Sequence, residues 1–173
     1  KRTKDSHSRF ICNCNHLEGI INLNERDYTH IIITKSTKDR IALGSALRYY
    51  CSLYRATNIK IGVINIPHET YRLRQVELDW LKDKLRFDGE IITFMDNDRT
   101  GIMEAIYFKR EFGFKPILIP KEYGAKDFAE LFSITAINTI CEYIKSTIEI
   151  IKYGKRNNIS NTSVGNVNDT LPF

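Results

Sequence analysis

Residues 90–101, with the sequence EIITFMDNDRTG, decide the fold, because an apolar run is followed at once by two acids and a helix start. The run from Glu90 to Met95 shows no alternation of polar and apolar residues, which is typical of a strand buried on both faces. Asp96 and Asp98 follow directly, and the apolar spacing of residues 99–112 predicts a helix. The stretch therefore predicts the strand–turn–helix unit of an α/β fold.

The same unit recurs on both sides of this stretch. Further strands are predicted over residues 31–34, 59–66 and 116–119. Helices are predicted from a capping-box pattern at Ser36 and Asp39, over residues 75–86, and from Asp127 to about Tyr153. Their apolar positions are expected to face the core, among them Ile41, Leu43, Leu47, Leu53 and Val76. This order predicts an α/β, Rossmann-like fold: a parallel four-stranded sheet flanked by helices.

The two ends of the chain differ from its centre. Residues 1–29 are expected to form a lead-in that starts with a basic arm. Residues 154–173 are rich in Asn, Ser, Thr and Gly and poor in apolar residues, which predicts a disordered, flexible tail. Between them we expect one domain over residues 30–134 and a C-terminal helix over residues 135–153.

Composition excludes several classes of protein. The 173 residues carry a net charge of +5 and are 42% hydrophobic, as in an ordinary globular chain with one core. No stretch approaches the roughly 18 apolar residues of a membrane span, and no signal peptide is evident, so we expect a cytoplasmic protein without a membrane partner. The cysteines are too scattered for a disulfide framework, and Cys12, Cys14 and His16 lack the second ligand pair of a structural zinc site.

Charged side chains follow the predicted strands, at the edge where such sheets bind ligands. Carboxylates are the ligands that Mg²⁺ prefers, with Mn²⁺ as a substitute, which makes four acids candidate metal ligands: Asp96, Asp98, Glu69 and Asp127. Ammonium and hydroxyl groups at the same edge suit a phosphate-bearing substrate, which makes three residues candidate substrate contacts: Lys35, Ser36 and Lys126.

Each of these residues also has a plainer interpretation. An Asp-Asn-Asp run after a strand often forms a turn and caps the next helix, and Lys126–Asp127 is more often a helix start than a catalytic pair. The chain contains neither GxxxxGK nor GxGxxG, which weighs against P-loop ATP hydrolysis and dinucleotide binding. The functional interpretation therefore depends on these residues meeting at one edge.

At these motifs the chain resembles the Toprim domain, shared by bacterial-type primases, type IA and II topoisomerases and several nucleases. The resemblance covers residues 30 to about 134 and is carried by residues 94–101 (FMDNDRTG), by Ile119–Pro120 and by Lys126–Asp127. Residues 33–39 (ITKSTKD) and His68–Glu69 resemble the Toprim domain of phage-type DNA primases.

One position departs from the usual Toprim pattern. Most Toprim domains carry a Glu at the end of the first strand, where it acts as acid/base or metal ligand, and here that position is Lys35. Glu69, at the neighbouring strand end, is expected to replace it. The alternatives are that metal and nucleotide bind differently here, or that the domain is inert.

The resemblance implies a nucleotidyltransferase, the Toprim catalytic domain of a phage-like DNA primase, which makes RNA primers on single-stranded DNA during DNA replication. It implies Glu69, Lys35 and Asp96 as catalytic residues, with nucleoside triphosphates, a single-stranded DNA template and a replicative helicase as partners. Two alternatives stay open: a Toprim nuclease or maturase that uses the same acids with water, and a non-catalytic nucleic-acid-binding module.

Overall fold

A parallel four-stranded sheet forms the centre of the molecule, as predicted. The computed structural model describes residues 16–54 and 58–147. Its strands are β1 (Tyr28–Thr34), β2 (Ile61–Asn65), β3 (Leu85–Phe94) and β4 (Lys115–Ile117). They lie in the order β2-β1-β3-β4, and every neighbouring pair is parallel. All four carboxyl ends therefore point to one edge of the sheet.

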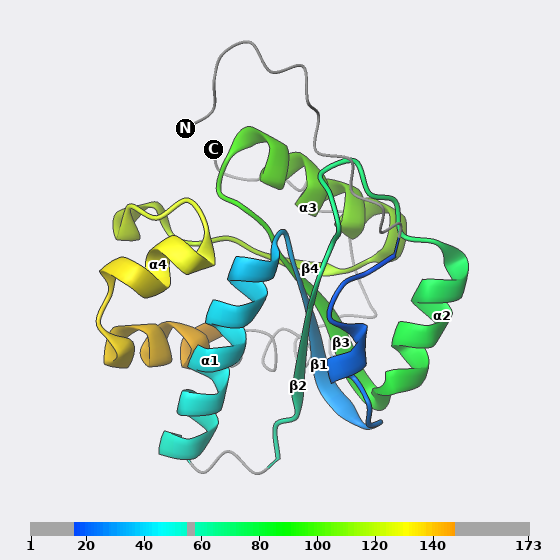
Figure 1. Cartoon of the computed structure of the whole chain (residues 1–173), viewed down its shortest axis with the longest axis horizontal. Coiled ribbons are helices and arrows are strands. Elements are labelled where there is room, and N and C mark those ends of the chain that lie inside the picture. Colours follow the sequence, from blue (N-terminus) through cyan, green and yellow to red (C-terminus); the bar gives the residue numbers. More distant parts are fainter. Residues whose placement is uncertain (1–15, 55–57, 148–173) are drawn as a thin grey trace, which may run out of the picture.

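Helices cover both faces of this sheet (Figure 1). On one face lie α1 (Thr37–Tyr54), α4 (Phe128–Ile134) and a helix over residues 137–147; on the other lie α2 (Gln75–Lys84) and α3 (Arg99–Phe112). β1 alternates between the two layers, since Ile32 packs with the α1 side while Ile31 and Ile33 pack with the α2 side. The α/β fold class is thus confirmed, and no described helix is long and apolar enough to cross a membrane.

Three apolar positions expected in the core face solvent instead. Ile41 and Leu53 of α1 are 57% and 51% exposed, and Val76 of α2 is 66% exposed. Helix α1 packs through a narrower face, Leu43, Ala46, Leu47 and Tyr50, whose spacing follows the helical repeat. Ile41 lies two residues before this face starts, roughly 200° around the helix from Leu43, and Leu53 lies in the last turn beyond it. The prediction that these residues face the core was therefore wrong, because it rested on their hydrophobicity alone.

The ends of several elements differ from the sequence prediction. The helix predicted over residues 75–86 ends at Lys84, and β3 begins at Leu85, so the strand is longer than residues 90–95. The long helix predicted from Asp127 to Tyr153 is broken: α4 ends at Ile134, and the next helix spans residues 137–147 of the described chain.

Part of the lead-in belongs to the folded domain. Leu17 and Leu23 are 1% exposed and pack in the α2–α3 layer. Glu18 forms an antiparallel bridge to Asn65 at the end of β2. The fold therefore begins before residue 30. The basic arm, Cys12, Cys14, the tail and the last residues of the predicted C-terminal helix lie outside the described residues.

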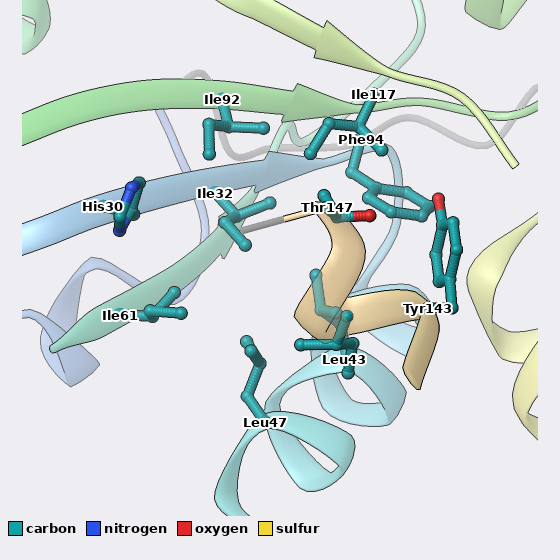
Figure 2. Close-up of a pocket in the computed structure, with 11 residues that line it drawn as sticks. His30, Ile32, Leu43, Leu47, Ile61, Ile92, Phe94, Ile117, Tyr143 and Thr147 are labelled. Atoms are coloured by element: carbon teal, nitrogen blue, oxygen red, sulfur yellow. The ribbon is translucent and has the colours of Figure 1, made fainter. Parts of the chain in front are cut away.

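An apolar pocket lies between the sheet, α1 and residues 137–147 (Figure 2). Ile32 and Ile92 from the sheet, Leu43 from α1 and Tyr143 from the C-terminal helix point towards it. None of the predicted site residues lines it. The chemistry predicted from the sequence must therefore be sought at the carboxyl edge.

Candidate functional site

Strand order places Lys35 at the centre of the carboxyl edge. Lys35 directly follows β1, and β1 lies between β2 and β3. Glu69 follows β2 and the Asp96–Asp98 turn follows β3, so the two neighbours bring their acids to either side of the lysine. The structure thus brings together Lys35, Glu69, Asp96 and Asp98, which form the Lys35 cluster.

The ammonium of Lys35 is shared among three carboxylates. Its Nζ lies 3.4 Å from Asp96 Oδ2, 3.5 Å from Glu69 Oε1 and 4.0 Å from Asp98 Oδ1. These distances exceed the ~2.7–2.9 Å of a direct charge-assisted hydrogen bond, so no single acid holds the ammonium. The side chains of Lys35 and Asp96 are 9% and 16% exposed, whereas that of Glu69 is 68% exposed. The cluster is therefore buried at Lys35 and open to solvent at Glu69.

Burial and charge act in opposite directions on this cluster. Burial alone would lower the pKa of Lys35, but the surrounding acids, above all Asp96, raise it above its usual value. Burial raises the pKa of Asp96, and the attraction of Lys35 only partly offsets this. The folded protein therefore favours the charged lysine and disfavours the charge on Asp96.

The residues around the Asp96–Asp98 turn fix its shape. The Asp98 side chain caps α3 by accepting a 2.8 Å hydrogen bond from the Gly101 N–H, as the plainer interpretation holds. Asn97 donates from its side chain to the Ile119 carbonyl at 3.0 Å and from its backbone to the Lys126 carbonyl. This turn is thus held against the loop after β4.

Asp127 and Ser36 belong to a second polar cluster at the same edge, the Asp127 cluster, which also contains Lys38 and Asp39. Asp127 is 2% exposed, caps α4 through a 2.8 Å hydrogen bond from the Glu130 N–H, and accepts a 2.6 Å hydrogen bond from Lys38 Nζ. Burial would raise the pKa of Asp127, but these interactions, first that with Lys38, lower it below its usual value. The Ser36 hydroxyl donates to the buried carboxylate of Asp39.

Lys126 lies next to Asp127 in the chain, and its charge helps to lower the pKa of Asp127. Its N–H donates to Glu130 Oε2 at 2.8 Å, and its side chain is exposed. The structure therefore does not bring Asp127 and Lys126 into the Lys35 cluster, although their loop lies beside it.

Glu104 is a further acid of the Lys35 cluster that the sequence analysis missed. It lies on α3 and is 7% exposed, and neither carboxylate oxygen has a hydrogen-bond partner among the described residues. Burial raises the pKa of Glu104 to about 7, and the charges of Lys35, Glu69 and Asp96 act on it as well. A signal was present, because Glu104 shares the helical spacing of the buried residues Gly101, Ala105 and Phe108.

The donor chemistry of the Lys35 cluster suits Mg²⁺ or Mn²⁺. Carboxylate oxygens are hard ligands, and Glu104 supplies two buried ones that lack hydrogen-bond partners in the described chain. Within residues 16–54 and 58–147, however, no three His, Cys, Asp or Glu side chains are gathered closely enough to hold a metal ion. The ammonium of Lys35 lies among the acids instead. The donor chemistry therefore suits the cation, whereas in the described residues the acids surround the Lys35 ammonium.

The comparisons with known proteins give one structural likeness. No protein-family model and no curated protein matches the sequence. Among solved structures, a small TOPRIM domain protein from Bacillus stearothermophilus is 18% identical, with a TM-score of 0.42, over 61% of this chain and 79% of its own length. The fold described here rests on the strand order and directions of this chain's own sheet. The chain is an α/β protein whose sheet carries an acidic cluster around Lys35 at its carboxyl edge.

Proposed function

We propose that this chain is the Toprim catalytic domain of a phage-like DNA primase, a metal-dependent nucleotidyltransferase that makes RNA primers on single-stranded DNA. The observation that supports this proposal is the convergence of Glu69, Asp96 and Asp98 on Lys35 from the two strand ends on either side of β1. The motif resemblance supplies the reaction class. Nucleoside triphosphates and a DNA template are the substrates, and a replicative helicase is the expected partner.

The reaction is the attack of a 3′-hydroxyl on the α-phosphorus of an incoming nucleotide. Mg²⁺ or Mn²⁺, held by Asp96 and Asp98, would neutralise triphosphate charge. Glu69, the most exposed acid of the cluster, would accept the hydroxyl proton or complete the cation site. Lys35 would then contact phosphate, with Ser36 and Lys126 at the rim.

A primer-synthesis assay tests this proposal directly. The full chain is incubated with single-stranded DNA, labelled ribonucleotides and Mg²⁺ or Mn²⁺, and short RNA products are resolved on a gel. We expect products from the wild type and from Glu111→Gln, an exposed acid of α3 outside the cluster, but none from Asp96→Asn. Cleavage of the nucleic acid without nucleotides would instead indicate the nuclease function, in which water replaces the hydroxyl.

A non-catalytic nucleic-acid-binding module is the second candidate, and one observation favours it. The Lys35 ammonium already pairs with the three acids that a catalytic cation would need. If this pairing is permanent, the wild type binds single-stranded DNA equally well with Mg²⁺ or EDTA and yields neither primers nor cleavage products. Cation-dependent product formation of either kind would exclude this candidate.

A further inference from the structure

Glu104 is an acid at a buried position of α3, where an apolar residue is expected. The buried face of α3 consists of Gly101, Glu104, Ala105 and Phe108, and Glu104 alone is charged. Its side chain is more than nine-tenths buried, and both oxygens lack hydrogen-bond partners in the described chain. Burying a carboxylate without hydrogen bonds is costly, so such a group calls for an explanation, of which a bound ion is one.

The face that carries Glu104 is the one that packs on the Asp96 turn. A Cβ at Gly101, one turn before Glu104, would lie 2.1 Å from the Asp96 carbonyl oxygen, so α3 touches the Asp96 backbone there. Glu104 lies one helical turn further along the same face. The charges of Lys35, Asp96 and Glu69 act on its carboxylate, which is consistent with that direction.

Glu104 and the acids contacting Lys35 approach the cluster from different depths. Glu69 and Asp98 have side chains that are 68% and 47% exposed, whereas Glu104 is 7% exposed as a residue. The Lys35 ammonium thus interacts electrostatically with four acids. Its distances to three of them are too long for full charge-assisted hydrogen bonds. The cluster keeps excess negative charge that a divalent cation could neutralise.

We propose that Glu104 is the buried ligand of the divalent-cation site at this edge, and that Lys35 occupies the cation's position until the cation binds. This inference rests on the proposed function only in that both require a cation among these acids. Glu104 would bind from the buried side, and Asp96 from the sheet. The displaced ammonium of Lys35 would move outward, towards the phosphate of the substrate.

Mn²⁺ binding to the full chain, followed by isothermal titration calorimetry without nucleotide, tests the inference independently of activity. The variants are Glu104→Gln, which keeps the shape of the side chain, Lys35→Met, and the control Glu111→Gln on the exposed face of α3. We expect Glu104→Gln to weaken binding by about 10- to 100-fold, Lys35→Met to tighten it, and Glu111→Gln to leave it unchanged. Circular dichroism melting establishes that each variant is folded.

Three outcomes would overturn the inference. They are wild-type affinity in folded Glu104→Gln, weaker binding in folded Lys35→Met, and no Mn²⁺ binding by the wild type. If Lys35→Met does not fold, the double variant Lys35→Met/Glu104→Gln replaces it. Removing the competing ammonium should make this double variant bind Mn²⁺ more tightly than Glu104→Gln does, and weaker binding would overturn the inference. Primer synthesis separates the two proposals. If the wild type makes primers and Glu104→Gln binds Mn²⁺ with unaltered affinity, Glu104 is not a cation ligand and the proposed function still holds.

Discussion

Two clusters at the same edge of the sheet contain similar residues and differ in how their acids are satisfied. In the Asp127 cluster, a backbone N–H and Lys38 both donate to Asp127, and the Ala129 N–H and Ser36 donate to Asp39. In the Lys35 cluster, one ammonium is spread over several acids. The first arrangement stabilises the fold, whereas the second leaves charge available for a ligand.

The pKa shifts of the two clusters point in opposite directions, although burial acts in the same direction in both. Burial would raise the pKa of Asp127, but the hydrogen bond from Lys38 and the Glu130 N–H lower it, so the fold favours its charge. Burial raises the pKa of Asp96 and of Glu104, so the fold disfavours theirs. Substitution should therefore affect stability in one cluster and function in the other.

The largest effect is expected from Asp96→Asn. We expect primer synthesis to fall below detection, because the cation loses the acid nearest to Lys35. The free energy of unfolding should stay unchanged or rise, because the fold disfavours the charge that is removed. Gel assay and urea denaturation of the same preparation measure both. Activity lost together with stability would place Asp96 with the structural acids instead.

Glu69→Gln should show whether the exposed acid of the Lys35 cluster performs chemistry. We expect kcat to fall by about 10²–10⁴ with nucleotide binding nearly intact, as for the loss of a general base. Steady-state kinetics with varied nucleotide separates kcat from KM. A near-normal kcat would leave the missing strand-end Glu without a replacement and would strengthen the non-catalytic candidate.

Glu104 should make the protein less stable as the pH rises. Its pKa is about 7 in the folded chain against 4.5 normally, so the folded state binds more protons between these values. The contribution of Glu104 to the free energy of unfolding is then fully present below about pH 4.5. It falls by roughly 3 kcal/mol as the pH rises through about 7. Urea denaturation in EDTA at a series of pH values should show this loss in the wild type and not in Glu104→Gln. An identical pH profile in both would mean that Glu104 is not held in a costly environment.

The smallest effect is expected in the structural cluster. Asp127→Ala should lower the free energy of unfolding by roughly 2 kcal/mol, because α4 loses its cap and Lys38 its partner. Mn²⁺ affinity should remain as in the wild type, since Asp127 is engaged elsewhere. Denaturation and calorimetry test the two statements. A loss of Mn²⁺ affinity in a stable variant would move Asp127 to the cation site and erase the difference between the clusters.

Much of the fold followed from local patterns. The run from Ile31 to Thr34 predicted a buried strand because β-branched residues without alternation suit a sheet covered on both faces, and the structure buries all of β1. The bounds predicted for α3, Arg99–Phe112, agree with the structure because Asp98 caps its start and Gly113 ends it with a positive φ. Ile41 was misassigned because hydrophobicity alone does not say which face of a helix packs.

The sequence by itself determined which chemical groups stand at the strand ends, since each strand, turn and helix is specified by nearby residues. It did not determine which strands are neighbours. Only the order β2-β1-β3-β4 places Lys35 between Glu69 and Asp96, and only the packing of α3 on the Asp96 turn brings the buried Glu104 into their electrostatic field. The physical reason is that strand order and helix orientation are settled by burying apolar area across the whole chain, a sum over distant contacts that no local pattern contains.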